Sequence, residues 1–292
     1  MSSSNRADVR DFLVTRRARI TPQQAGLTFY GGNRRVPGLR REEVAMLAGV
    51  SADYYTRLEK GNLSGVSDTV LDAIASALQL DEAERLHLTD LARAANTSPA
   101  RAARRNVPQR VRPGIRLILD GMADTPAFIR NGRLDILAVN TLGRALYSPV
   151  FTNHGGTPNL ARFRFFDPAA RQFYPDFADS AHTTVELLRT EAGRDPFNPS
   201  LTGLIGELST RSEEFRALWA AHNVRLHRTG IKHFNHPAVG RLDLMFEAMA
   251  LEADEGLTLT AYTAEPGTPS HDGLKLLASW AATHQGEDIK AS

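Results

Sequence analysis

The stretch from residue 39 to residue 61, LRREEVAMLAGVSADYYTRLEKG, constrains the fold more than any other part of the chain. Apolar residues recur at helical spacing in its first half and again in its second half, which predicts two short helices. Gly49 lies between them, where a sharp turn needs a residue that tolerates positive φ. Ser51 is suited to cap the second helix, because its hydroxyl can accept a hydrogen bond from an early backbone amide. We expect Tyr55 and Leu58 to be buried and the polar side chains of the second helix to face outward.

The order of these residues resembles the helix-turn-helix of the phage-repressor type, the XRE-like family. A small Ala, Gly at the turn, an adjacent aliphatic residue, Ser, and then Leu-Glu-Lys-Gly at the end of the second helix follow in the order expected of that family. Helices that cross closely need small residues at the crossing, and the second needs a slim polar face to enter a major groove about 12 Å wide. The resemblance implies binding of double-stranded DNA. An ordinary helical hairpin within an enzyme is the alternative.

The residues expected to contact DNA lie on the second helix and at the start of the first. Arg41 should bind a phosphate, and Arg57 is the best-placed contact to a guanine or a phosphate. Asp53 either accepts a hydrogen bond from cytosine or only stabilises the helix N-terminus through the dipole. The predicted DNA-binding residues of the motif are Arg41, Ser51, Ala52, Asp53, Tyr54, Thr56, Arg57 and Lys60.

A long connection, residues 21–38, precedes the motif and departs from the short turn of the repressor pattern. It contains two prolines and four glycines. A loop of this length in a small helical domain is usually functional or disordered. Arg34 and Arg35, at its tip, are predicted to reach DNA phosphates; a solvated loop without that role is the alternative.

Length and composition bound the other possibilities. A chain of 292 residues is expected to hold about two domains. Residues 1–60 contain 11 Lys and Arg against six Asp and Glu, whereas residues 114–292 contain 17 against 21, which fits a nucleic-acid module followed by a domain that avoids DNA. No apolar run approaches the roughly 20 residues of a membrane span, and the N-terminus has no apolar signal core, so we expect a cytoplasmic protein without membrane contact. The absence of cysteine excludes disulfides, thiolate metal sites and cysteine nucleophiles.

The helical pattern predicts a first domain at residues 1–95 with five helices, as in repressor-type domains. Its last helix is expected to open with a capping box formed by Asp81 and Glu84. Residues 96–106, NTSPARAARRN, have the small, polar and basic composition of a linker. The second domain is therefore predicted at residues 107–292.

Strand patterns distinguish the second domain. Residues 126–140 hold two short apolar runs around Asn131-Gly132, a pair typical of two-residue hairpin turns. Helical patterns fill the middle, and three more strands follow, of which residues 242–250 alternate most clearly between apolar and polar. Further helices are expected at 107–122 and 273–282. The fold class predicted is multidomain: an all-α domain followed by an α+β domain with five antiparallel strands and its helices on one side.

A second resemblance comes from three segments of this domain: residues 161–177 (ARFRFFDPAARQFYPDF), 212–225 (SEEFRALWAAHNVR) and 232–249 (KHFNHPAVGRLDLMFEAM). They are similar to the ligand-binding domain of MmyB-like transcription regulators. The resemblance implies a PAS-like domain that binds a long-chain fatty acid or a similar lipid-like effector. Phe177 departs from it, since Trp is expected after the Tyr-Pro-Asp run, and this changes pocket width rather than the assignment.

A pocket between a curved sheet and its helices suits an apolar ligand with one polar head. Each buried CH₂ contributes about 0.8 kcal/mol, so an acyl chain binds with few polar contacts. A structural role in helix–sheet packing is the alternative for every candidate. The ligand-binding residues predicted are Phe128, Arg130, Asn140, Arg162, Trp219, His222 and Arg225.

Enzymatic functions lack a sequence signature. Neither HExxH, GxSxG, a Walker sequence nor a Gly-rich dinucleotide loop is present. Four histidines fall within residues 222–236, but no carboxylate stands at a metal-ligand spacing from them. We expect no catalytic residue, no metal and no cofactor.

Together these patterns predict a sequence-specific regulator of transcription, expected to be a repressor, that binds an inverted-repeat operator as a homodimer with half-sites about one helical turn apart. Its second domain is predicted to sense a small apolar, fatty-acid-like effector. The alternative is a second domain that only dimerises or docks a protein partner and holds no small ligand. The sign of the effector's action on DNA binding is left open.

Overall fold

The computed structural model describes residues 3–27, 36, 38–96, 109–152, 156–224 and 227–290. The chain forms two compact units. The first comprises residues 1–107, 189–206 and 217–226, and the second comprises residues 108–188, 207–216 and 227–292. The linker predicted at 96–106 lies, apart from Asn96, outside the described residues.

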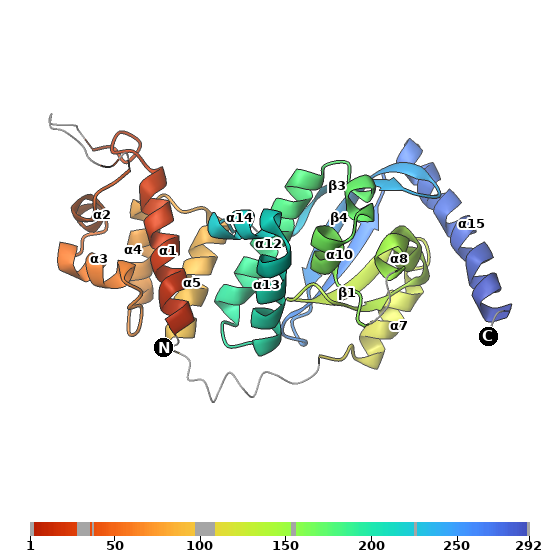
Figure 1. Cartoon of the computed structure of the whole chain (residues 1–292), viewed down its shortest axis with the longest axis horizontal. Coiled ribbons are helices and arrows are strands. Elements are labelled where there is room, and N and C mark those ends of the chain that lie inside the picture. The colour runs from red at the N-terminus through yellow and green to blue at the C-terminus, as the bar shows by residue number, and fades with distance from the viewer. Residues whose placement is uncertain are drawn as a thin grey trace. The chain divides into compact units, whose positions relative to one another are not determined.

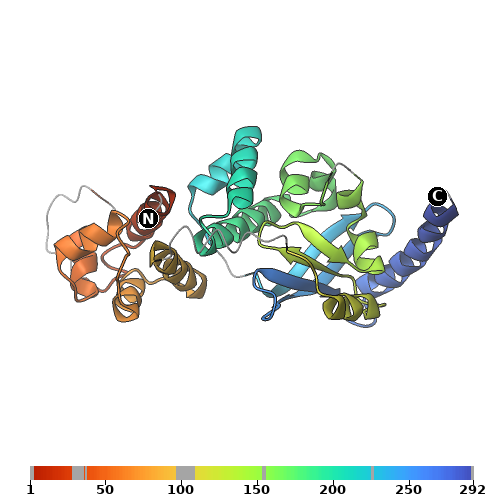
Figure 2. The same ribbon diagram turned by 90° about the horizontal axis from the view of Figure 1, so that it is seen from below.

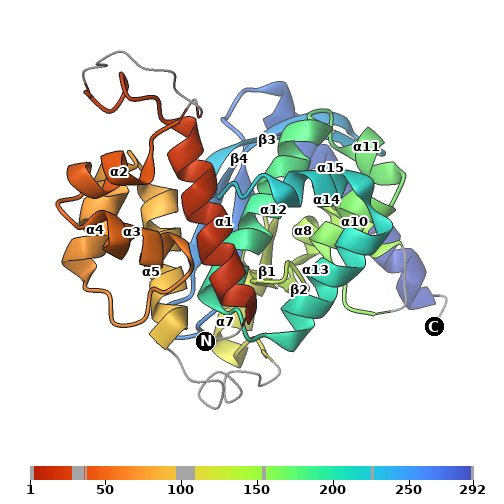
Figure 3. The ribbon, with the colours of Figure 1, turned by 60° about the vertical axis from the view of Figure 1, so that its left-hand side comes forward.

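The N-terminal part of the first unit consists of five helices, as predicted (Figure 1). They surround a core that includes Phe12, Leu13, Val44, Tyr55 and Leu58, all 1% exposed or less. Figure 3 shows α1 crossing in front of α5, with α2 to α4 beside it. The helices are α1 (Ser3–Arg19), α2 (Arg41–Leu47), α3 (Ala52–Glu59), α4 (Asp68–Ala77) and α5 (Glu82–Asn96).

Side-chain caps set where these helices begin. The Ser51 hydroxyl accepts from the Tyr54 amide at 3.1 Å and opens α3. Before α5 the predicted capping box is confirmed: the Glu84 amide donates to Asp81 at 2.9 Å, and the Asp81 amide donates to Glu84 at 3.2 Å. Each cap satisfies backbone donors that have no partner inside the helix.

Two glycines set where the helices of the motif end. Gly49 has φ +65° at the turn between α2 and α3, and Gly61 has φ +92° after α3. A Cβ at Gly49 would meet no atom within 4 Å, whereas a Cβ at Gly61 would lie 2.5 Å from the Arg6 carbonyl oxygen. Gly61 therefore permits both the backbone conformation and the close approach of α1.

The second unit is built on a five-stranded antiparallel sheet, which confirms the α+β prediction. The strand order is β2-β1-β5-β4-β3, so the last three strands form a meander whose final strand pairs with β1. In β4, Leu242, Leu244 and Phe246 are buried and their neighbours are exposed, as the alternation predicts. The strands are β1 (Ala127–Asn131), β2 (Ile136–Val139), β3 (Thr229–His236), β4 (Gly240–Ala250) and β5 (Leu257–Thr263).

Helices cover both faces of this sheet, and the expectation of helices on one side only was wrong (Figure 2). On one face Leu119 of α7 (Pro113–Gly121) packs with Ile129 and Leu259. On the other face Phe128, Phe234 and Tyr262 belong to a large aromatic core. β1 and β5 are interior strands of the sheet. Each has apolar side chains on both faces of the sheet, so helices must cover both faces. The helices on the aromatic side are α8 (Thr141–Leu146), α9 (Ser148–Phe151), α10 (Leu160–Phe166), α11 (Ala169–Phe173) and α15 (Pro269–Lys290).

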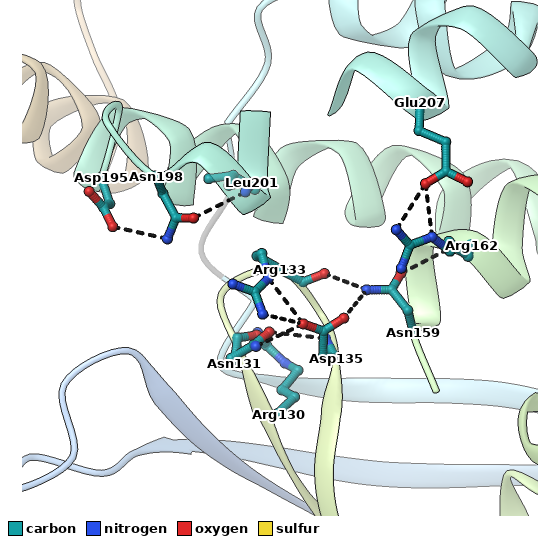
Figure 4. A network of polar contacts seen from close by, with 10 residues as sticks. All are labelled: Arg130, Asn131, Arg133, Asp135, Asn159, Arg162, Asp195, Asn198, Leu201 and Glu207. Carbon is teal, nitrogen blue, oxygen red and sulfur yellow. Dashed lines mark hydrogen bonds and ion pairs between the residues drawn. The ribbon is translucent and has the colours of Figure 1, made fainter. Parts of the chain in front are cut away.

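Three further helices follow α11 along the chain before β3. They are α12 (Phe177–Arg194), α13 (Pro199–Arg211) and α14 (Glu213–Ala220). The side chain of Asn198 accepts from the Leu201 amide at 3.1 Å, which confirms the predicted cap before the proline that opens α13 (Figure 4).

The hairpin between β1 and β2 differs from the predicted two-residue turn. Four residues, 132–135, connect the strands. The Asn131 side chain donates to Asp135 at 2.9 Å and accepts from the Asp135 amide at 3.0 Å, and Asp135 also accepts from Arg133 and Asn159 (Figure 4). The Asn–Asp pair closes a wider loop, so Asn131 ends the strand instead of forming the turn.

One further helix boundary and the burial of one residue also differ from expectation. The helix expected from Val107 begins at Pro113, where the fixed φ of proline suits the first helical position. Of the apolar residues at helical spacing in α2, which were expected to form one buried stripe, Val44 and Ala45 are buried but Leu47 is 37% exposed. None of the helices in the described part of the chain is long and apolar enough to span a bilayer.

Candidate DNA-binding surface and effector cavity

The outward face of α3 carries most of the predicted DNA-binding residues. Asp53, Arg57 and Lys60 are exposed, as is Ser51 at the cap, whereas Tyr55, Leu58 and Glu59 point inward. The partly exposed residues of this surface are Ala52, Tyr54 and Thr56. The helix therefore separates a polar outer face from a packed inner face, as entry into a groove requires.

Arg57 is supported by a neighbour on the same helix. Its guanidinium lies 4.8 Å from the centroid of the Tyr54 ring, within cation–π distance. The pair is three residues apart, so the two side chains share one face of α3. Tyr54 thus limits the rotamers of Arg57 and keeps the cation at the surface.

The buried carboxylate of Glu59 anchors the C-terminal end of α3. Glu59 is 2% exposed and accepts two hydrogen bonds from Arg17 of α1, at 2.9 and 3.0 Å. Arg41 of α2 donates a third at 3.2 Å while its side chain remains 48% exposed. Arg41 can therefore hold Glu59 and still present guanidinium nitrogens to a phosphate. Arg34 and Arg35 lie outside the described residues.

The second unit contains a partly enclosed cavity of about 90 Å³ between α10, α12 and the sheet. Its apolar wall includes Phe128, Leu134 and Phe246. Two larger surface hollows, of about 940 and 440 Å³, are more open. Of these three, and within the residues that the structure describes, the small cavity alone is lined by buried side chains that lack hydrogen-bond partners, and for that reason we take it as the candidate ligand site.

Three polar side chains of the cavity are unpaired within the described structure. Arg164 of α10 is 3% exposed, and its Nε and Nη1 have no hydrogen-bond partner. The hydroxyl groups of Tyr174 and Ser180 are likewise buried and unpartnered. The Arg164 guanidinium lies 3.4 Å from the centroid of the Tyr174 ring, and burial lowers its pKa. Buried polar groups are normally satisfied, so this cluster indicates a missing partner.

A second cation lines the same cavity. The Lys232 ammonium lies among aromatic rings, 5.4 Å from the centroid of Tyr174 and 5.8 Å from that of Phe234. Burial, followed by the charges of Arg164 and Arg130, lowers the pKa of Lys232 to about 7.

Of the predicted ligand residues, Phe128 and Arg130 line this cavity. Asn140 does not: its Oδ1 accepts from the Ala127 and Gly143 amides, and its Nδ2 donates to two backbone carbonyls at 2.8 Å. Arg162 is exposed on α10 and pairs with Glu207 at 2.9 Å (Figure 4).

The remaining predicted ligand residues lie elsewhere. Trp219 and His222 belong to the first unit, where the Arg189 guanidinium lies 4.0 Å from the Trp219 ring centroid and its Nη1 lies 2.9 Å from His222 Nδ1. Burial, followed by the charge of Arg189, lowers the pKa of His222 to about 4. Arg225 lies outside the described residues.

Sequence reasoning missed Arg164, Tyr174, Ser180 and Lys232. The strand period offers a signal for the last of these, because Lys232 lies two residues before the buried Phe234 and so shares its face. Phe177, where the family resemblance led us to expect Trp, does not line the cavity but packs 4.2 Å from the Arg171 guanidinium. In the part of the chain that the structure describes, no group of three or more His, Asp or Glu is arranged to hold a metal ion.

Two family models match the sequence. Residues 14–88 match a helix-turn-helix domain, and residues 111–277 match the MmyB-like transcription regulator ligand binding domain. A DNA-binding unit and a ligand-binding unit in one chain define a transcription regulator, not an enzyme. The chain belongs to the MmyB-like transcription regulators, since that model covers more than half of it. Both resemblances drawn from the sequence are thereby confirmed. No curated protein matches the chain.

Proposed function

We propose that this protein is a cytoplasmic repressor that binds an inverted-repeat operator as a homodimer and is controlled by a small, partly apolar, fatty-acid-like effector. The observation that carries the proposal is the cavity of the ligand-binding domain, where Phe128, Leu134 and Phe246 form an apolar wall beside unpaired Arg164. Such a combination of apolar surface and a few polar groups is typical of sites for small ligands. On the DNA side, the exposed face of α3 supports base contact through Arg57.

The operator part of the proposal is tested by selecting binding sites from random DNA with the full chain, followed by footprinting. We expect a two-fold symmetric site with half-sites about one helical turn apart. A site without symmetry, protected by one chain, would contradict the homodimer. Reporter repression from the selected site then distinguishes a repressor from an activator.

The effector part is tested by native mass spectrometry of the purified protein, followed by denaturing extraction. We expect a co-purifying mass of a few hundred daltons or less, identified as an organic acid. The second candidate function is a domain that only dimerises or docks a protein. It is favoured by α7, whose Leu117 and Ile118 are 73% and 60% exposed. A chain that carries no ligand and binds none in a screen would support that candidate.

A further inference from the structure

The polar lining of the ligand-binding cavity includes one buried cation, Arg164, whose Nε and Nη1 have no hydrogen-bond partner among the described residues. Arg130, Arg164 and Lys232 line the cavity, against the carboxylates of Asp176 and Asp179. Asp176 Oδ2 also lies 3.8 Å from His233 Nε2. A cation held in a protein interior without a counter-ion is strongly unfavourable. Arg164 is therefore the group that most needs an anionic partner.

The unpaired groups of this polar lining are all able to donate. Arg164 offers its Nε–H and Nη1–H, and the hydroxyls of Tyr174 and Ser180 offer O–H groups. An ionised carboxylate only accepts, with about four lone-pair positions, and matches such a set. An amide, an alcohol or an amine would leave the guanidinium charge uncompensated.

The size of the cavity limits the rest of the ligand. One buried water occupies about 10–15 Å³ of cavity volume. If each non-hydrogen atom of a ligand needs a similar volume, the cavity of about 90 Å³ suits a ligand on the order of ten non-hydrogen atoms. Phe128 and Phe246 supply an apolar surface for a hydrocarbon part. A chain of about sixteen heavy atoms, such as myristate, would extend beyond the enclosed part of the cavity.

We propose that the cavity binds a compact monocarboxylic acid, a short- to medium-chain or aromatic acid, whose carboxylate accepts hydrogen bonds from Arg164, Tyr174 and Ser180. This inference rests on the proposed function and deepens it, because it names the residues that hold the effector's acid group and the length of its apolar part.

Isothermal titration of the full chain with octanoate, benzoate and myristate tests the ligand class, with octan-1-ol as the neutral probe and inorganic phosphate as the alternative anion. We expect octanoate or benzoate to bind at least about ten times more tightly than octan-1-ol, since hydrogen bonds to a charged group are the strong ones. Octan-1-ol binding as tightly as octanoate would overturn the proposal. So would a preference for phosphate or for myristate.

Variants of α10 test the residue assignment with a matched control. Arg164→Met should abolish acid binding and raise the melting temperature of the ligand-free protein, because it removes an unpaired buried charge. Arg162→Met, two residues away on the exposed side of the same helix, should leave acid binding unchanged. Tyr174→Phe removes one hydroxyl and should weaken octanoate binding by about ten-fold, which keeps the test decisive if Arg164→Met does not fold. Unchanged acid binding in Tyr174→Phe and in a folded Arg164→Met would overturn the assignment.

Failure of this inference is distinguishable from failure of the proposed function. A protein that binds its operator and responds to a neutral or cationic co-purified ligand would contradict the carboxylate site and leave the effector function standing. A protein whose operator binding responds to no small ligand would contradict both.

Discussion

Two arginines of α10 show how much the surroundings of a residue decide its role. Arg162 and Arg164 are two positions apart, yet Arg162 is exposed and paired with Glu207, whereas Arg164 is buried and unpaired. The helical period turns the two side chains to different sides of the helix. Sequence reasoning chose Arg162 as a ligand residue, because a charge pattern alone does not say which side of a short helix is buried.

Among the residues predicted to contact DNA, Arg57 offers the sharpest test. We expect Arg57→Ala to weaken binding to the selected operator by about 1–3 kcal/mol and to relax specificity at one base pair if the side chain contacts a base. Arg93→Ala, an exposed arginine on α5, is the control and should leave affinity within error. Equal affinity of Arg57→Ala and the unaltered chain, measured by fluorescence anisotropy, would contradict the assignment.

Lys232 makes acid binding depend on pH. In the free protein its pKa is about 7, and a bound carboxylate favours the protonated ammonium. Affinity for octanoate should therefore be highest below pH 7 and fall by up to about ten-fold per pH unit above it.

The other charged groups around Lys232 are Arg164 on α10, Arg130 on β1 and Asp179 on α12, and the imidazoles of His227 and His233 also line the cavity. Comparison with Lys232→Met isolates the lysine, because the variant keeps all of these groups. The slope above pH 7 should disappear in titrations of this variant. A slope that persists unchanged would assign the pH dependence to another group.

At the scale of elements, the two turn glycines of the helix-turn-helix provide a matched pair. Both have positive φ, but only Gly61 is also in close approach to another backbone. Gly49→Ala should lower the free energy of unfolding by about 1–2 kcal/mol through backbone conformation alone. Gly61→Ala should lower the free energy of unfolding by clearly more, since the Arg6 carbonyl must also move to make room for the Cβ. Urea unfolding followed by circular dichroism measures the difference, and equal losses would refute the steric argument.

Elements whose ends are marked by local chemistry were predictable from the sequence. Ser51, the Asp81–Glu84 box and Asn198 each cap a helix where the residue types indicate it. Elements whose shape depends on residues further apart in the sequence were not predictable in this way. The β1–β2 loop is widened by the hydrogen-bonded pair Asn131 and Asp135. The rule that Asn-Gly forms a two-residue turn considers adjacent residues only and does not include this pair. The cavity likewise combines α10, α12 and β3, whose contact depends on tertiary packing.

At the scale of the whole molecule, the proposed effector has two separate readouts, the stability of the folded chain and its affinity for the operator. A ligand that binds only the folded protein stabilises it by RT ln(1 + [L]/Kd), about 2.7 kcal/mol at a hundredfold excess over Kd. Octanoate should therefore raise the melting temperature of the full chain. If it also binds the DNA-binding and non-binding states with different affinity, as the proposed function requires, it should change the affinity for the operator. Arg164→Met should show neither effect while still binding the operator. A change in operator affinity that survives in this variant would place the effector elsewhere.

The carboxylate of Glu59 has a further consequence for regulation. It joins α1, α2 and the end of α3 through Arg17 and Arg41, so the helix that meets the DNA is anchored at its base to two others. A helix held in this way moves as one piece with its domain and keeps its side-chain geometry. In the proposed homodimer, an effector can then alter the distance or angle between two such domains, but not the bases that each one prefers. Operators selected with and without effector should accordingly share one half-site sequence and differ only in spacing or occupancy.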